Sequence, residues 1–189
     1  LDHHTTLTGF KWIARAPGLG FGYEEAIGFC PDPAHVRDKD GIATSVVAAS
    51  LVAALKAQGR SVWDELERLA RLHGLHVSSP LTFRVEQIEQ IASGMARLRA
   101  QPPSVLVGSP VVEVSDLSQG YRGLPPTDGV LVLTEAGDRV IARPSGTEPK
   151  LKCYLEVILP VAEGEALPWE QARERLDSIK GAFAEIIGL

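Results

Sequence analysis

Two apolar, strand-like runs flank a polar stretch at residues 143–152, and this pattern constrains the fold more than any other feature. The upstream run covers residues 129–142 and is interrupted at 135–138 by a turn-like Glu-Ala-Gly-Asp sequence. The downstream run covers residues 151–159, where apolar positions alternate with polar or aromatic ones. Period-two alternation bounded by turn residues is typical of β-strands. The sequence therefore predicts that residues 143–152 form a rigid loop held between two strands.

The residues of this loop suit an oxyanion. They provide a planar guanidinium fork, hydroxyl groups, a glycine that lets backbone N–H groups approach a ligand, and added positive charge. These groups belong to Arg143, Ser145, Thr147, Gly146, Lys150 and Lys152. Two prolines stiffen the turn, so little ordering is lost on binding. The alternative is a solvated hairpin loop with a chance basic cluster.

The order of the residues favours the first interpretation. Arg-Pro-Ser-Gly-Thr-Glu-Pro-Lys at residues 143–150 resembles the phosphate-binding loop of the α-D-phosphohexomutases, the superfamily of phosphoglucomutases and phosphomannomutases. In that family the loop lies in the C-terminal domain and holds the phosphate of the sugar substrate. The resemblance implies phosphate-binding roles for Arg143, Ser145, Gly146 and Thr147, with Lys152 as a further candidate.

A second stretch, at residues 22–28, places two adjacent carboxylates, Glu24 and Glu25, after a glycine-rich loop. Ionised carboxylates accept hydrogen bonds from sugar hydroxyls, although most Glu-Glu steps are ordinary solvated pairs. The stretch resembles the sugar-recognition loop of the same family, which implies that Glu24 and Glu25 bind the sugar. Ala26 stands where the family usually has serine, so one expected hydroxyl contact is absent and the identity of the sugar is left open.

Three cationic or titratable residues, His35, Arg37 and Lys39, alternate before a predicted helix at residues 42–57 that Asp40 would cap. Such a loop at a helix N-terminus suits an anionic ligand, and the alternative is a solvated, well-capped turn. The pattern resembles the family's His-x-Arg-x-Lys-Asp-Gly motif. The resemblance implies an acid–base role in catalysis for Lys39 and sugar contacts for His35 and Arg37.

Residues 8–12 also resemble a segment of the family, which implies an active-site cation at Lys11. From their composition, residues 8–13 are predicted to form a short strand. The helix at residues 42–57 is apolar on nearly every face, and this predicts that the helix is buried.

Periodicity divides the remaining chain into helices and extended segments. Helices are predicted after Ser61, over residues 85–98 and after Pro168, and extended segments at 77–85 and 105–114. The segment at 77–85 is expected to link two domains. We therefore predict an α/β and α+β protein: a partial α/β sugar-binding domain at residues 1–83, and at 84–189 an α+β domain with a largely antiparallel sheet packed by helices.

The composition argues against several classes of function. The net charge of −5 disfavours a nucleic-acid-binding surface. The two cysteines, Cys30 and Cys153, lie far apart and match no metal-binding spacing, and Cys153 falls on the apolar face of its strand. No run reaches about 18 apolar residues and no signal peptide is recognisable, so no membrane contact is expected and the chain is predicted to be cytoplasmic.

Two parts that the family's reaction requires are not found in this sequence. They are the loop whose serine carries the transferred phosphoryl group and the aspartate-rich loop that binds Mg²⁺. The resemblance therefore implies the C-terminal part of a longer mutase, whose N-terminal domains supply the serine and the metal ligands. It also implies a hexose bisphosphate activator for the parent. The chain alone is expected to be inactive.

The leading hypothesis is a phosphosugar mutase that moves phosphoryl between O1 and O6 of a hexose phosphate, through a phosphoserine and a bisphosphorylated intermediate. This chain would hold the sugar ring and the non-reacting phosphate, and that remote binding energy would orient the substrate. Ala26 suggests a phosphopentomutase-like activity on ribose phosphates as an alternative. A non-catalytic phosphosugar-binding module is the alternative from another class. The choice among glucose, mannose, glucosamine and ribose stays open.

Overall fold

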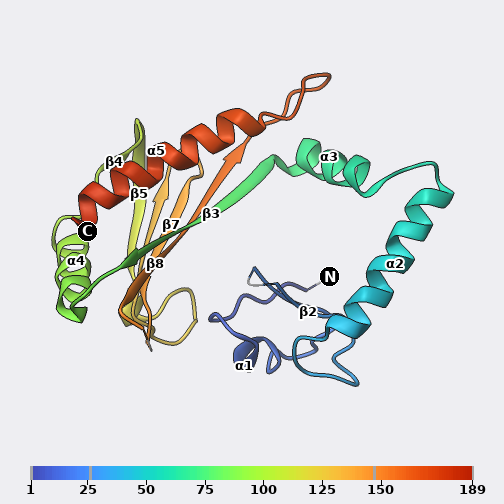
Figure 1. The fold of residues 1–189 in the computed structure, drawn as a ribbon, viewed down its shortest axis with the longest axis horizontal. Helices are drawn as coiled ribbons and strands as arrows, with labels where there is room; N and C mark the ends of the chain where they lie inside the picture. Colours follow the sequence, from blue (N-terminus) through green and yellow to red (C-terminus); the bar gives the residue numbers. More distant parts are fainter. Residues whose placement is uncertain (1, 26, 147, 189) are drawn as a thin grey trace. The chain divides into compact units, whose positions relative to one another are not determined.

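The computed structural model describes residues 2–25, 27–146 and 148–188 of the chain. The chain consists of two compact units, a first unit at Leu1–Leu66 and a second unit at Glu67–Leu189 (Figure 1). The division falls inside the helix α3, Val62–His73. The predicted domain boundary between residues 83 and 84 stays a prediction.

The first unit contains a short helix, a two-stranded hairpin and a long helix. These are α1 (Phe10–Ile13), β1 (Gly22–Glu24), β2 (Gly28–Cys30) and α2 (Gly41–Ala57). The two strands are antiparallel, with Tyr23 opposite Phe29. The predicted cap of α2 is confirmed, because the Asp40 carboxylate accepts hydrogen bonds from the backbone N–H groups of Ile42 and Ala43, both at 3.0 Å.

Helix α1 replaces the strand predicted at residues 8–13, and that prediction is wrong. The Gly9 carbonyl accepts hydrogen bonds from the N–H groups of Trp12 at 2.9 Å and Ile13 at 3.3 Å, which closes a helical turn. The turn leaves the Phe10 side chain buried. Short apolar runs are ambiguous between helix and strand when periodicity is the only signal, and here burial of one aromatic ring favours the helix.

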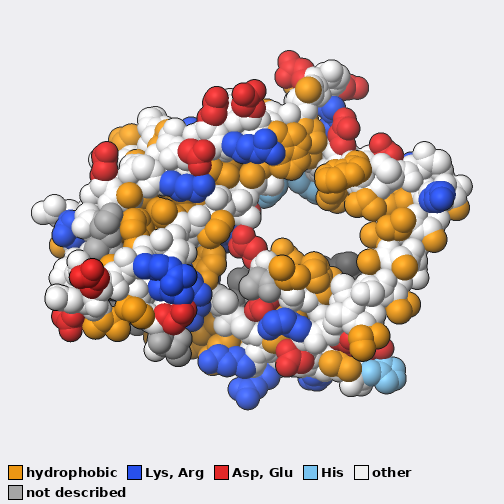
Figure 2. Space-filling view, viewed as in Figure 1, with side chains coloured by type: hydrophobic (Ala, Val, Ile, Leu, Met, Phe, Trp, Pro, Cys, Tyr) orange, Lys and Arg blue, Asp and Glu red, His pale blue; other side chains and the backbone are white. Residues whose placement is uncertain are grey.

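The helix predicted at residues 42–57 is present as α2, but its predicted burial is wrong. Within the described part of the chain, Leu55 is its one buried side chain, whereas Ile42 is 84% exposed and Val46 is 63% exposed. Figure 2 shows apolar side chains along this helix. A helix that is apolar all round needs neighbours on several sides, and the first unit provides a hairpin of two three-residue strands. Helix α2 is therefore mostly exposed in this chain, although its residues are largely apolar.

The second unit is an antiparallel six-stranded sheet with helices on one face, in the order β3-β8-β7-β6-β5-β4. The strands are β3 (Leu75–Arg84), β4 (Val105–Leu106), β5 (Ser109–Asp116), β6 (Val130–Thr134), β7 (Arg139–Pro144) and β8 (Lys150–Leu159). The helices are α4 (Ile88–Ala100), the 3₁₀ turn η1 (Leu117–Gln119) and α5 (Trp169–Ile187). The predicted fold class is confirmed.

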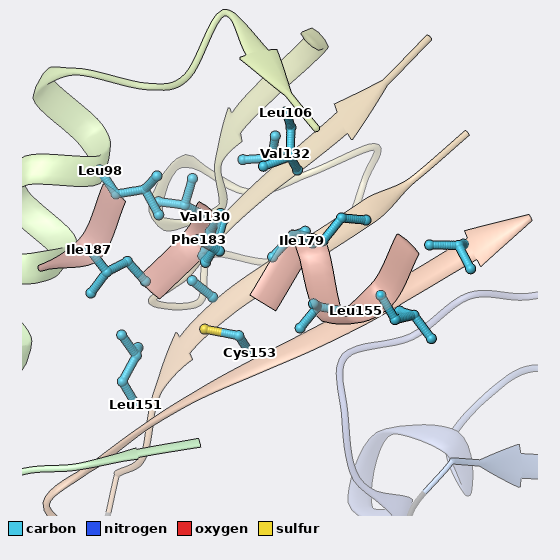
Figure 3. Close-up of a cluster of buried hydrophobic side chains, with 14 of the residues drawn as sticks. Leu98, Leu106, Val130, Val132, Leu151, Cys153, Leu155, Ile179, Phe183 and Ile187 are labelled. Atoms are coloured by element: carbon cyan, nitrogen blue, oxygen red, sulfur yellow. The ribbon is translucent and has the colours of Figure 1, made fainter. Parts of the chain in front are cut away.

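The core of the second unit lies between the sheet and the helices α4 and α5 (Figure 3). Alternate residues of β8 point into it, and Leu151, Cys153 and Leu155 are each at most 1% exposed. Helix α5 contributes Ile179 and Phe183, both fully buried, at the predicted helical spacing. The other residues of β8, beginning with Lys150 and Lys152, point to the opposite face of the sheet, which we call the open face.

The segment predicted to be extended at residues 77–85 is confirmed as extended, and the structure shows what it pairs with. Strand β3 pairs with β8 along its whole length, from Leu75 opposite Leu159 to Arg84 opposite Lys150. The segment is thus an edge strand of the second unit's sheet.

Among the described helices none is by itself long and apolar enough to cross a membrane; α2 and α3 pass that test only as a pair bent by 88°.

Candidate functional site

In the first unit, the structure brings together two of the predicted site residues, Glu24 and Lys39. Glu24 is the last residue of β1, and its side chain is only 12% exposed. The Nζ atom of Lys39 lies 2.9 Å from its Oε1 atom. The lysine loop is held against the hairpin because the Asp40 N–H donates a hydrogen bond of 2.9 Å to the Phe29 carbonyl. The two motifs therefore lie in contact and form one candidate site.

The ring of Phe10 completes this arrangement, and the sequence analysis did not select it. The Nζ atom of Lys39 lies 4.6 Å from the centroid of the Phe10 ring, a distance typical of a cation–π contact. A Cβ atom at Gly28 would lie 2.6 Å from Cγ of Glu24 and 2.7 Å from Cε2 of Phe10. Gly28 therefore allows Glu24 and Phe10 to pack closely beneath the lysine.

The other predicted residues of the first unit have different surroundings. His35 Nδ1 lies 2.7 Å from an Asp32 carboxylate oxygen, and Arg37 donates a hydrogen bond of 3.3 Å to the Ala14 carbonyl. Lys11 Nζ lies 5.6 Å from the centroid of the Trp12 ring. Glu25 is exposed at the hairpin turn, where its carbonyl accepts a bond of 2.7 Å from the Ile27 N–H. Ala26 lies outside the described residues.

The phosphate-loop motif of the second unit joins β7 to β8, and backbone hydrogen bonds close it. The Ser145 N–H donates to the Lys150 carbonyl at 2.8 Å, and the Lys150 N–H donates to the Glu148 carbonyl at 2.7 Å. The Val85 N–H, just after β3, donates to the Pro149 carbonyl at 3.1 Å. The Ser145 N–H is thus used within the loop, which leaves the Ser145 hydroxyl as this residue's group for a ligand. Thr147 lies outside the described residues.

Gly146 is not required by the packing of the protein around it. A Cβ atom at this position meets no protein atom within 4 Å, and the φ angle is not in the left-handed region. The space in front of its backbone is therefore open to a ligand, in contrast with the crowded Gly28.

Strand register places four cations at the loop end of the open face. Arg143 lies opposite Lys152, and Lys150 lies opposite Arg84. Directly opposed residues share a face of the sheet, as do residues two apart on one strand. Figure 2 shows Lys and Arg side chains gathered at this end of the sheet, where β7 and β8 are joined. The motif identified Arg143 and Lys152, whereas Arg84 is distant in sequence and only the β3–β8 pairing reveals it.

Glu148 provides a negative charge within this basic cluster. Its Oε1 atom lies 2.5 Å from Nζ of Lys150, whose side chain is 14% exposed. The hydrogen bond from Lys150 holds the pKa of the Glu148 carboxyl below its usual range, and the charges of Lys150, Lys152 and Arg84 act in the same direction. The loop is therefore electropositive although the chain carries a net charge of −5.

The described residues include no group of three or more His, Cys, Asp or Glu side chains arranged to hold a metal ion. Both cysteines are free thiols in buried positions. Cys153 is 1% exposed and belongs to the core, and this burial raises the pKa of its thiol to about 12. The cationic and carboxylate groups described above are suited to binding and positioning an anion and hydroxyl groups.

Two family models match this chain over most of its length. The model described as "Phosphoglucomutase/phosphomannomutase, alpha/beta/alpha domain III" matches residues 1–72, and the model described as "Phosphoglucomutase/phosphomannomutase, C-terminal domain" matches residues 83–170. The chain belongs to the phosphoglucomutase/phosphomannomutase family. The resemblance inferred from the sequence motifs is confirmed.

Curated members of the family are similar to this chain over part of their length. A protein named probable phosphomannomutase from Haemophilus influenzae is 42% identical over 151 residues, which are 80% of this chain and 30% of that protein. The phosphopentomutase of Mus musculus is 30% identical over 95% of this chain and 32% of its own length. A phosphoglucomutase of Staphylococcus aureus is 30% identical over 85% of this chain and 32% of its own length. The chain thus spans about a third of these relatives.

A solved structure of the family shares the fold. The open form of the Paramecium exocytosis-sensitive phosphoprotein pp63/parafusin, a phosphoglucomutase, superposes with a TM-score of 0.60 at 17% sequence identity. The match covers 90% of this chain and 31% of the Paramecium protein. The match shows that the two chains share a fold, and it carries no information on the substrate of this chain.

Proposed function

We propose that this chain is the sugar- and phosphate-binding part of a phosphosugar mutase that transfers phosphoryl between O1 and O6 of a hexose phosphate. The transfer proceeds through a phosphoserine and a bisphosphorylated intermediate, and the N-terminal domains of the parent supply the serine. The parent is an intramolecular phosphotransferase of the cytoplasm, and the chain alone is inactive. Residues 1–83 act as the sugar-binding domain and residues 84–189 as the phosphate-binding domain.

The observation that carries this proposal is the opposition of Arg143 and Lys152 beside an open loop backbone at Gly146. The planar guanidinium of Arg143 binds two oxygens of the non-reacting phosphate, and the Ser145 hydroxyl donates to a third. Thr147 contributes a second hydroxyl, as its place in the motif implies. Lys152 adds charge. These contacts fix one end of the substrate.

The ion pair of Glu24 and Lys39 supports a role for the first unit in holding the sugar ring. The carboxylate of Glu24 accepts hydrogen bonds from ring hydroxyls, and Glu25 lies next to it at the hairpin turn. Lys39, held between Glu24 and the Phe10 ring, donates a proton or a hydrogen bond at the reacting oxygen. Lys11, His35 and Arg37 are the outer sugar contacts in this proposal.

Magnesium and a hexose bisphosphate activator belong to the proposed parent enzyme. The described residues of this chain do not form a site that fits Mg²⁺, so no step is assigned to a metal here. When bound in the parent, Mg²⁺ stabilises charge on the transferred phosphoryl group.

A second candidate is a phosphopentomutase-like activity on ribose phosphates. The mouse phosphopentomutase matches 95% of this chain, and Ala26 stands where the family's sugar-recognition loop usually has serine. A smaller sugar needs fewer hydroxyl contacts. Comparing a hexose phosphate with ribose phosphate as ligands distinguishes the two candidates.

Binding of phosphate by the chain itself tests the proposal. Chemical-shift titration with inorganic phosphate and with a hexose phosphate should first move the amide signals of Arg143 and of residues 145–147. Arg143→Lys keeps the charge but loses the fork, and we expect it to weaken binding by about 1–3 kcal/mol, the usual scale for a hydrogen bond with a charged group. Lys180→Gln, in an exposed pair with Asp177 on α5, is the control.

Two results would contradict the proposed role of the loop. One is a set of shifts that cluster away from residues 143–147. The other is an Arg143→Lys variant that is folded and binds phosphate as well as the unmodified chain does.

A further inference from the structure

The loop end of the open face carries more positive charge than the phosphate-loop motif accounts for. Arg143 and Lys150 belong to the motif and Lys152 to its extension, but Arg84, which lies opposite Lys150 on the same face, comes from outside the motif. Arg84 comes from β3, the edge strand, and is exposed. Among the ion pairs of the described residues, the one at this end of the sheet joins Lys150 to Glu148, and none involves Arg84, Arg143 or Lys152.

One carboxylate lies at this end of the sheet in contact with a lysine of the cluster. Glu148 contacts Lys150 at 2.5 Å, and its own side chain is 47% exposed. The charges of Lys152 and Arg84 also reach it, since both lower its pKa. Glu148 is itself part of the motif, and its carboxylate therefore lies within the basic cluster that Lys150, Lys152 and Arg84 form.

We propose that Arg84 and Lys150 are part of the phosphate-binding site and that the Glu148 carboxylate is an internal counter-ion which the substrate phosphate displaces from Lys150. This inference rests on the proposed function, because it extends the same phosphate site. It assigns a specificity-determining role to three residues. Arg84 and Lys150 contact the phosphate directly, and Glu148 competes with it for Lys150.

Charge and geometry both favour the exchange. A phosphate monoester carries up to two negative charges and three acceptor oxygens, whereas Glu148 offers one charge and two oxygens. The Glu148 carboxylate is 47% exposed, so water competes for its pair with Lys150 and releasing it costs little. The ammonium group of Lys150 has three donors and can move to a new acceptor. A ligand of single charge gains less from the exchange, so the arrangement favours phosphate over monovalent anions.

Affinity for inorganic phosphate in three variants of the chain tests this proposal, measured by calorimetry at low and constant salt. Glu148→Gln should tighten binding about two- to fivefold, the factor that corresponds to a weak exposed ion pair. Arg84→Gln should weaken binding about tenfold or more, as expected for loss of a charged hydrogen-bond donor. Glu163→Gln, at an exposed glutamate of the segment between β8 and α5, is the matched control for the loss of one negative charge.

The outcomes separate this inference from the proposed function. Unchanged or weaker binding by Glu148→Gln, relative to Glu163→Gln, overturns the counter-ion role and makes Glu148 a residue that positions Lys150. Binding by Arg84→Gln equal to that of the unmodified chain removes Arg84 from the site. If Arg143→Lys weakens binding while both new variants match the control, this inference alone fails. If the unmodified chain binds no phosphate, the proposed function and this inference fail together.

Discussion

The Nζ atom of Lys39 lies 2.9 Å from the Oε1 atom of Glu24, so the candidate acid–base lysine and the candidate sugar-binding carboxylate form an ion pair. The pair is supported from one side by the Phe10 ring, 4.6 Å from the ammonium group. A change at either residue therefore affects both. If Glu24 binds a sugar hydroxyl and Lys39 donates the proton, as proposed, substrate binding at Glu24 also changes the surroundings of the proton donor.

Replacing Glu24 by Gln in the full-length parent should lower kcat/KM for the cognate sugar phosphate about 10- to 100-fold. Hydrogen bonds that involve a charged group contribute roughly 1.5–3 kcal/mol, and the amide loses both that charge and the ion pair with Lys39. Steady-state kinetics measure the effect, with Glu163→Gln as the control. A folded Glu24→Gln enzyme with unchanged kcat/KM would exclude the assigned role.

Replacing Gly28 by Ala should destabilise the first unit by about 1–3 kcal/mol, the usual cost of overpacking. The new Cβ atom would lie 2.6 Å from Cγ of Glu24 and 2.7 Å from Cε2 of the buried Phe10 ring. Gly20→Ala is the matched control, because a Cβ atom there meets nothing within 4 Å. Urea unfolding of both variants checks the prediction, and equal midpoints would show that the packing around Gly28 is looser than the structure indicates.

Removing Arg175 should strongly destabilise the second unit. Its guanidinium donates hydrogen bonds of 2.7 and 2.6 Å to the two carboxylate oxygens of Asp138, whose side chain is 1% exposed. Arg175→Ala leaves a buried charge without its partner, which typically costs about 3–5 kcal/mol. Lys180→Ala breaks an exposed pair with Asp177 on the same helix and should cost about 1 kcal/mol or less. Comparable losses in the free energy of unfolding would contradict this ranking.

The thiol of Cys153 should resist modification in the folded protein. Its pKa is raised to about 12 by burial, so the reactive thiolate is nearly absent at pH 8. A thiol reagent at pH 8 should label Cys153 only after denaturant unfolds the second unit. Without denaturant, raising the pH toward 12 should increase the labelling rate of the folded protein. Mass spectrometry of the labelled protein identifies the site. Rapid labelling of Cys153 at pH 8 without denaturant would show that the strand is not packed as described.

The local patterns of the sequence determined much of this protein. Alternation along residues 151–159 predicted β8 and the burial of Cys153, because a strand turns successive side chains to opposite faces. Asp40 predicted the start of α2, because capping needs only neighbouring residues. The order of residues at 143–150 indicated the family before any contact was known. Each of these signals depends on residues that are close in sequence.

The tertiary structure decided what depends on residues far apart in the chain. The pairing of β3 with β8 brings Arg84 beside Lys150, and no motif records the register of an edge strand. The contact of Phe10 with Lys39 likewise joins helix α1 to a loop about 30 residues further along the chain. The apolar sequence of α2 led to a wrong prediction of burial, because burial requires neighbouring elements, and the hairpin beside α2 is too small to cover it. Hydrophobic pattern specifies which surface can be buried, and only the packing partners determine whether it is.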